Sequence, residues 1–232
     1  MTTNNNSEDK VNKIVPSKLE TAFQKFLYRT IGKRIPQNVT PNQITLLGAI
    51  GGLIGIICAF LSVISPFFLI GSILGLISHL ICDDLDGYVA RTRNMSSKSG
   101  AYFDLLTDIL HITFLIIGLA FSGVISFQIA VFMVPVYALM MFTSMNYILY
   151  LKEFLFPRLG PIETHMFFAA LCVSGIVFKG KPLFCVKDFP VKCGDIICFV
   201  GCILMYFEMI RLEIQLFNRL KKVDKKDRDN EE

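Results

Sequence analysis

Long apolar runs separated by short polar segments dominate the chain from residue 42 onward. Each run is close to the roughly 20 residues that an α-helix needs to cross a hydrocarbon core about 30 Å thick. The pattern therefore predicts an all-α fold, a polytopic membrane bundle of six transmembrane helices. We expect these helices at about 42–64, 67–91, 99–122, 127–151, 163–178 and from 195 past 209.

The segment between Pro16 and Pro36 follows a different pattern. Its apolar residues recur at helical spacing and its basic residues fall at other positions, which predicts an amphipathic helix in the membrane interface. The alternative is a short cytosolic helix packed on the protein's own surface. We therefore divide the chain into a polar N-terminus with this helix (1–36), the six-helix domain (37–220) and a charged cytosolic tail (221–232).

Composition supports a membrane protein, because 53% of the 232 residues are apolar and their arrangement in long runs excludes a water-soluble globular enzyme. The 23 Lys and Arg and 19 Asp and Glu residues give a formal charge of +4. Of the basic residues, 19 fall in segments on the same predicted side as both chain ends. Basic loops face the cytosol, so both termini are expected there, in a bacterial inner membrane or the endoplasmic reticulum. No nucleic-acid partner is expected.

The seven cysteines form no CxxC pair and no zinc-ligand spacing. Cys185 and Cys193 both lie in the loop predicted on the far side of the membrane, where a disulfide is allowed. Whether these two residues are bridged stays open at this stage, because sequence does not supply the required geometry.

Four carboxylates occur inside the second and third apolar runs. Asp83 and Asp86 are three residues apart, and Asp104 and Asp108 are four apart, so each pair projects from one helical face. Such a concentration of negative charge near lipid is costly without a cation. Oxygen ligands indicate hard divalent ions, and a pair of them can polarise a phosphate group. The pattern is consistent with a pair of hard divalent ions such as Mg²⁺, Mn²⁺ or Ca²⁺, and we expect two Mg²⁺ or Mn²⁺ ions.

Residues beside these acids suit a phosphate ester. Gly87 and Ala90 continue the face of Asp83 and Asp86 and leave room for a bulky ligand, while Arg91 and Arg93 suit phosphate oxygens. The alternative is that the acids form ordinary helix-end ion pairs with nearby basic residues. Intramembrane carboxylates are usually functional, which favours a diphosphate site.

Residues 83–108 fit, without a gap, the signature D-x2-D-G-x2-A-R-x8-G-x3-D-x3-D, and in this respect the chain resembles the CDP-alcohol phosphatidyltransferase family. The PN-x2-T segment at 41–45 and the predicted layout are also similar to that family. The resemblance implies an enzyme, often a homodimer in the membrane, that transfers a substituted phosphate from a CDP-linked donor to an alcohol acceptor and releases CMP.

The resemblance also implies roles for individual residues. Asp83, Asp86 and Asp104 would hold the metal ions, and Asp108 would be the catalytic base on the acceptor hydroxyl and a further ligand. The residues that would bind the CDP-linked donor are Asn42, Thr45, Gly87, Ala90, Arg91 and Gly100.

Two stretches bear on the substrates. GAYFDLLTD (100–108) is similar to phosphatidylinositol synthases, which favours a CDP-diacylglycerol donor and a small polar alcohol such as inositol. LGPIETH (159–165) resembles ethanolamine and choline phosphotransferases, so the alternative is transfer from CDP-ethanolamine or CDP-choline to diacylglycerol or a related lipid alcohol. Candidate residues for acceptor recognition are Arg93, Lys152, Arg158, Glu163 and His111.

Some of these residues have simpler explanations. Glu163 at a helix start can instead be stabilised by the helix dipole, and His111 can be a packed, hydrogen-bonded residue. Functions of another class are a cation transporter or a non-catalytic membrane protein. The carboxylates lie at helix ends rather than at the membrane midplane, which disfavours a transporter, and a non-catalytic protein leaves them unexplained.

Overall fold

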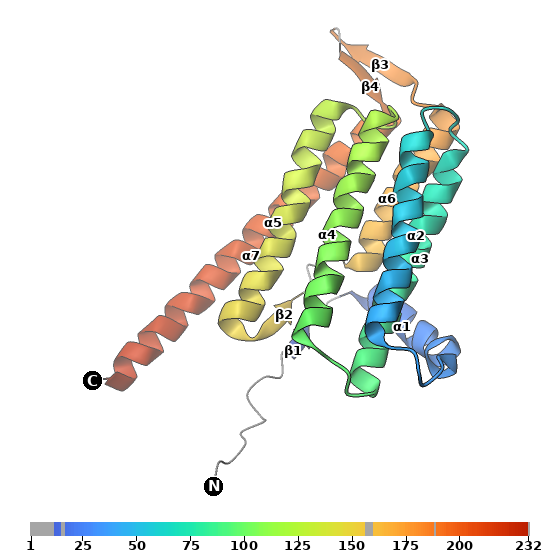
Figure 1. Cartoon of the computed structure of the whole chain (residues 1–232). Coiled ribbons are helices and arrows are strands. Elements are labelled where there is room, and N and C mark those ends of the chain that lie inside the picture. The colour runs from blue at the N-terminus through green and yellow to red at the C-terminus, as the bar shows by residue number, and fades with distance from the viewer. Residues whose placement is uncertain (1–11, 15–16, 156–159, 188, 232) are drawn as a thin grey trace.

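The computed structural model describes residues 12–14, 17–155, 160–187 and 189–231, and its bundle of helices confirms the predicted all-α fold (Figure 1). Within these described residues, six helices are long and apolar enough to cross a membrane, so the chain is an integral multi-pass membrane protein. These helices are α2 (Pro41–Leu61), α3 (Phe68–Thr92), α4 (Lys98–Phe121), α5 (Phe127–Leu151), α6 (Pro161–Phe178) and α7 (Cys193–Glu231). The predicted ends of the first five helices and the predicted start of the sixth agree with the structure to within three residues.

Local capping interactions explain where α2 and α4 begin. Thr40 accepts a hydrogen bond from the main chain of Gln43, whose side chain accepts one in return from the Thr40 main chain, and Pro41 opens the first turn. Ser97 accepts from the main-chain N–H of Gly100 at the start of α4. The cap at Thr40 fixes the start of the helix that carries Asn42 and Thr45.

Small residues bring α2 and α3 into close contact. A Cβ atom on Gly75 would lie 2.5 Å from the Cα of Gly55, so glycine is required at this approach. Beside it, Ser72 donates a 2.8 Å hydrogen bond to the carbonyl of Gly55. This contact holds together the two helices that bear Thr45 and Asp83.

A 13-residue helix, α1 (Lys18–Thr30), lies across one end of the bundle, followed by the short 3-10 turn η1 (Gly32–Arg34) (Figure 1). Leu27 is 2% exposed, whereas Phe26 beside it is 64% exposed. The helix thus packs one side on its own protein and leaves apolar surface uncovered on another, so its place in the membrane interface stays a prediction. We call this end of the bundle, where the 93–97 turn also lies, the α1 end.

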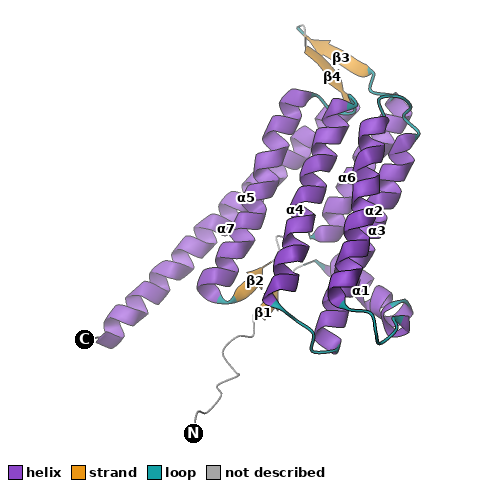
Figure 2. Cartoon of the chain, viewed as in Figure 1, coloured by secondary structure: helices purple, strands orange, loops and turns teal. Residues whose placement is uncertain are grey.

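Two small sheets lie at the ends of the bundle and were not predicted (Figure 2). At the α1 end, β1 (Asn12–Ile14) pairs in parallel with β2 (Glu153–Leu155), and at the opposite end β3 (Pro182–Val186) and β4 (Phe189–Lys192) form an antiparallel hairpin. Cys185 lies in β3 and Cys193 begins α7, and both thiols are free. The disulfide that the sequence left open is therefore not formed.

The last helix is longer than a membrane crossing requires. α7 runs for 39 residues without a break, past the predicted end of the membrane domain at residue 220. The predicted tail is therefore, as far as Glu231, a continuation of this helix, which leans away from the bundle beside α5 (Figure 1).

Candidate active site

Three carboxylates converge at the α1 end of the bundle. Asp83 comes from the final turns of α3, and Asp104 and Asp108 come from the first turns of α4. One oxygen of each lies within 4.8 Å of the others, and all three residues are half-buried. We call them the acid cluster. The spacing that put each pair on one helical face, together with the short 93–97 turn, explains why residues 21 to 25 positions apart meet.

The acid cluster borders a small hollow with an empty volume of about 150 Å³. Its lining combines carboxylates with hydroxyl groups, one imidazole and a glycine, and comprises Thr45, Gly48, His79, Asp83, Asp86, Asp104, Thr107 and Asp108. Oxygen ligands of this kind are what Mg²⁺ and Mn²⁺ prefer in proteins. The residues present thus fit the divalent ions that the sequence predicted.

The fourth predicted ligand, Asp86, lines the same hollow but stands apart from the other three. It is only 5% exposed, and its Oδ2 accepts a 2.5 Å hydrogen bond from the hydroxyl of Thr45. Thr45 also contacts the carbonyl of Pro41 one turn earlier, at 3.2 Å. Thr45, which was predicted to bind the donor, therefore holds the carboxylate of Asp86 on α3 against α2.

Other residues predicted to bind the donor do not line the hollow but lie about one helical turn nearer the α1 end, a position that we call its mouth. A Cβ atom on Gly100 would come within 2.9 Å of Asn42 Oδ1, so these two signature residues bring the starts of α2 and α4 together. A Cβ atom on Gly87 would lie 3.0 Å from Arg91 Nη1, which means that the guanidinium lies over this glycine. Ala90 is half-buried one turn further along α3.

Arg91 is held in place by α1. Its Nη2 donates a 3.1 Å hydrogen bond to the hydroxyl of Tyr28, and the Tyr28 ring stacks on Tyr88 with 4.6 Å between centroids. Burial raises the pKa of Tyr28 to about 12, so its hydroxyl stays protonated at neutral pH. No sequence signal had singled out Tyr28, because it lies 63 residues from Arg91.

The residues predicted to recognise the acceptor do not gather at the hollow. The Arg93 guanidinium donates to the main-chain carbonyls of Ile35, Pro36 and Val39 at 2.8–3.0 Å and so fastens the segment before α2. Lys152 is exposed in a left-handed conformation where α5 ends. Arg158 lies outside the residues that the structure describes.

Glu163 is engaged at the start of α6. Its Oε2 accepts from the main-chain N–H of Gly160 at 2.9 Å, and its Oε1 accepts a hydrogen bond from the hydroxyl of Ser17. Both carboxylate oxygens therefore serve a helix cap that joins α6 to the start of α1. This arrangement supports the structural explanation for Glu163 rather than acceptor recognition.

A buried polar contact that the sequence did not predict reinforces this junction. Glu20 of α1 is 2% exposed and accepts from the main-chain N–H of Ile162 at 3.2 Å. Gln24, one turn along α1, donates at 2.7 Å to both Glu20 and Asp84 of α3. α1 is therefore attached to the two helices that carry Asp83 and Glu163.

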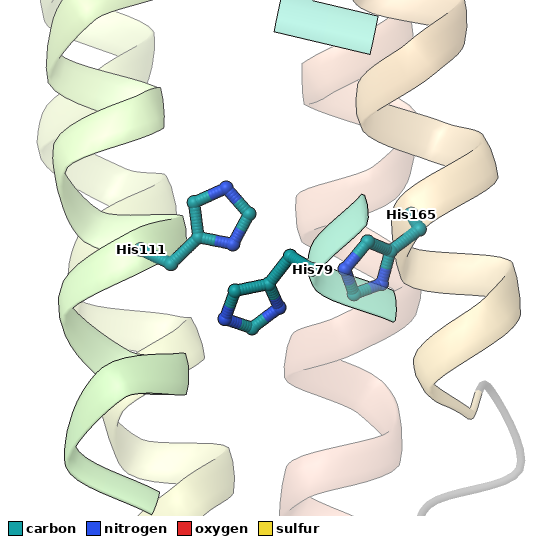
Figure 3. A group of neighbouring side chains, drawn as sticks. All are labelled: His79, His111 and His165. Carbon is teal, nitrogen blue, oxygen red and sulfur yellow. The ribbon is translucent and has the colours of Figure 1, made fainter. Parts of the chain in front are cut away.

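The three histidines also come together, one helical turn deeper than the acid cluster. His79 precedes Asp83 by four residues and His111 follows Asp108 by three, and both are 4% exposed. His165 of α6 completes the group, which we call the histidine cluster (Figure 3). His79 Nε2 lies 3.6 Å from Asp108 Oδ1, so the two clusters adjoin. The sequence did not indicate this group, because the helix that carries His165 lies far along the chain from α3 and α4.

Comparison with known proteins agrees with the site. The family model for CDP-alcohol phosphatidyltransferases matches residues 38–210, which includes α2 to α6, the first part of α7 and the whole acid cluster. No curated protein matches the chain. Members of this family are phosphotransferases that move a substituted phosphate from a CDP-alcohol to an acceptor in phospholipid synthesis, and they use divalent metal. The chain belongs to the CDP-alcohol phosphatidyltransferase family.

Proposed function

We propose that this phosphotransferase uses CDP-diacylglycerol as donor and a small polar alcohol such as inositol as acceptor, with CMP as the leaving group. The observation that carries the proposal is the acid cluster, whose oxygens lie within 4.8 Å of one another in a hollow at the bundle end. These carboxylates occupy the signature positions of the family.

Asp83, Asp104 and Asp108 would hold two divalent ions, Mg²⁺ or Mn²⁺, with Asp86 beside them on the same hollow. When bound, such ions neutralise the diphosphate and polarise the phosphorus that is transferred. The hydrogen bond from Thr45 keeps Asp86 oriented within the hollow. Arg91, lying over Gly87 at the mouth, suits the outer oxygens of the diphosphate.

Asp108 is the group that would take the proton of the acceptor hydroxyl. Its side chain keeps 24% of its surface exposed and faces the hollow, so an alcohol can approach it. As the acceptor oxygen bonds to phosphorus, the bond from phosphorus to the CMP oxygen breaks and the hydroxyl proton passes to Asp108. A positioned base of this kind typically contributes about 10²- to 10⁴-fold in rate.

The structure bears on the choice of acceptor through two stretches. GAYFDLLTD, the stretch similar to phosphatidylinositol synthases, forms the start of α4 and supplies Asp104 and Asp108. Glu163, the residue that could have recognised an amine, instead has both oxygens engaged in the α6 cap. These contacts favour inositol-type over ethanolamine- or choline-type chemistry.

The α1 end of the bundle would face the cytosol, with both termini on that side, because 19 of the 23 basic residues lie in the segments assigned there. This orientation lets a soluble alcohol reach the hollow while a lipid donor enters from the membrane. The protein would act as a homodimer in a bacterial inner membrane or the endoplasmic reticulum.

The test is CMP release by the purified protein in detergent with Mg²⁺ or Mn²⁺. CDP-diacylglycerol is offered with inositol, serine or glycerol phosphate, and CDP-ethanolamine and CDP-choline are offered with diacylglycerol. We expect CMP from CDP-diacylglycerol with inositol. Release only from CDP-ethanolamine or CDP-choline would overturn the substrate assignment, and no release from any pair would overturn the proposed activity.

A further inference from the structure

The histidine cluster has the composition of a second, different metal site. One ring nitrogen from each of His79, His111 and His165 lies within 4.8 Å of the others. The ring centroids of His79 and His111 are 4.1 Å apart, and that of His165 lies 5.9 and 6.3 Å from them. Figure 3 shows the three rings turned toward a common space between α4 and α6.

The nitrogens in this space lack partners. Among the residues that the structure describes, His79 Nδ1, both ring nitrogens of His111 and His165 Nε2 are buried and make no hydrogen bond. Native proteins rarely bury ring nitrogens without satisfying them. Unsatisfied nitrogens on three converging rings therefore indicate a bound group rather than three independent packing residues.

The second nitrogen of two of these rings faces an oxygen. His165 Nδ1 lies 2.8 Å from the carbonyl of Pro161, so Nδ1 carries the proton and Nε2 presents its lone pair. His79 Nε2 lies 3.6 Å from Asp108 Oδ1, which favours a proton on Nε2 and a lone pair on Nδ1. The lone pairs thus belong to the buried, unpartnered nitrogens. Metal-binding histidines are typically oriented in this way by a carbonyl or carboxylate behind the ring.

The neighbouring helix leaves room for the rings. A Cβ atom on Gly52 of α2 would lie only 3.1 Å from Cδ2 of both His79 and His111. A larger residue there would press on both imidazoles. The three atoms nearest to the added Cβ all belong to the side chains of His79 and His111, and none is a main-chain atom. The space that the histidines occupy is therefore created by a glycine on a third helix.

From this geometry we infer that His79, His111 and His165 bind one Zn²⁺ ion, separate from the ions of the acid cluster. Three imidazole nitrogens suit Zn²⁺, whereas Mg²⁺ prefers oxygen. Zn–N bonds of about 2.1 Å require nitrogens about 3.4 Å apart in a tetrahedral site. Since the nitrogens lie within 4.8 Å of one another, they would move closer by at most about 1.4 Å. Asp108 supplies nearby negative charge that favours a divalent cation in this buried place.

Such an ion would act on the neighbouring site through His79. Its Nδ1 would bind the ion and its Nε2 would face Asp108, so the imidazole would be a positioning residue for that carboxylate. His79 also lines the hollow of the acid cluster. The inference goes beyond the proposed function and does not depend on which substrates the enzyme uses.

Co²⁺ binding to the full-length protein in detergent tests this inference, because four-coordinate Co²⁺ with nitrogen ligands absorbs visible light far more strongly than octahedral Co²⁺ on oxygen ligands. After removal of metals with EDTA, we expect one strongly absorbing Co²⁺ per chain. Zn²⁺ should displace it, and excess Mg²⁺ should not. Absence of the strong band, or its loss on adding Mg²⁺, would overturn the inference without any variant being made.

Variants assign the band to its ligands. His165→Gln and His111→Asn should each weaken Co²⁺ binding at least tenfold. The matched control, Asp83→Asn, should keep the strong band and lose Mn²⁺ binding. Retention of the full band in both histidine variants, or its loss in Asp83→Asn alone, would place the ion elsewhere and contradict the inference.

Discussion

The acid cluster and the histidine cluster lie about one helical turn apart on α3 and α4, yet they differ in chemistry and exposure. The three carboxylates are half-buried and border a hollow at the end of the bundle. His79 and His111 are buried deeper, with 4% of their surface exposed. Charged carboxylates need water or ions close by, whereas neutral imidazoles can be buried in the bundle at lower cost.

This difference indicates two kinds of cation site. A half-buried oxygen site suits ions that arrive with a diphosphate substrate and exchange with solvent. An enclosed nitrogen site suits an ion that stays bound and orients its neighbours. The two cation sites adjoin at the contact between His79 and Asp108, at 3.6 Å, so an ion bound at one site would affect the other through this contact. The following changes test how separate the two clusters are.

The largest effect is expected for Asp108→Asn. Losing the proposed base should reduce CMP release by about 10³-fold. The matched control is Asp84→Asn, at a neighbouring carboxylate of α3. The asparagine keeps a side-chain oxygen that can accept the hydrogen bond from Gln24. That control should retain CMP release within about threefold of wild type. Full turnover of a folded Asp108→Asn protein would show that another group accepts the proton.

A smaller loss is expected for Thr45→Val, which removes the hydrogen bond to buried Asp86. A hydrogen bond to a charged group is worth about 1.5–3 kcal/mol, so CMP release should fall about 30-fold. Thr45→Ser keeps the hydroxyl and should stay near the wild-type rate. Equal activity of the valine and serine variants would mean that this bond does not orient Asp86 for catalysis.

Gly52→Ala is designed to disturb only the histidine cluster. Its new methyl group would press on the rings of His79 and His111 at 3.1 Å. We expect Co²⁺ affinity to fall about tenfold, as is typical when the surroundings of a metal ligand are changed. Mn²⁺ binding at the acid cluster, measured on the same sample, should change by less than about threefold. Equal losses at both clusters would show that they form one site.

The smallest effect is expected far from both clusters, at the ion pair between Glu153 and Arg219, whose shortest contact is 2.6 Å. The Arg219 side chain is 44% exposed, so Glu153→Gln should lower the free energy of unfolding by less than about 1 kcal/mol. The hydrogen bond from Arg219 lowers the pKa of Glu153. The contribution of this ion pair to the free energy of unfolding is therefore present at neutral pH and is lost as the pH falls through the lowered pKa of Glu153.

Thermal unfolding of wild type and Glu153→Gln at neutral and acidic pH checks that expectation. The difference in unfolding temperature between the two proteins should shrink as the pH falls below the ordinary pKa range of glutamate. A difference that grows under acid conditions would mean that Glu153 stabilises the fold through something other than its charge.

The contrast between the clusters also explains what the sequence could predict. The acid cluster was predictable because Asp104 and Asp108 share one helical face and Asp83 lies on the preceding helix, across a short turn. The spans and the Thr40 cap were predictable for the same reason, since hydrophobic length and capping are local signals.

The histidine cluster was not predictable in this way. His79, His111 and His165 come from three helices, and their meeting depends on how α6 packs beside α3. Arg93 and Glu163 were assigned to acceptor recognition for the same lack of tertiary information. The structure instead shows them engaged with the 35–39 segment and the α6 cap. Residue type suggested chemistry there, but packing determined the contacts.

The two small sheets were missed because their strands are only three to five residues long. Strands this short carry too little alternation of apolar and polar residues to be recognised. The pairing of β1 with β2 also joins segments about 140 residues apart, so no turn signal in the local sequence predicts it.

The central claim is that the acid cluster is the metal site of a CMP-releasing phosphotransferase. It is tested most directly by the metal dependence of CMP release from CDP-diacylglycerol and inositol, measured on one preparation before EDTA, after EDTA and during Mn²⁺ titration. Release should stop in EDTA and return as Mn²⁺ is added, and Asp83→Asn should require far more Mn²⁺ to recover. Undiminished CMP release in EDTA, or an unchanged Mn²⁺ requirement in Asp83→Asn, would contradict the account.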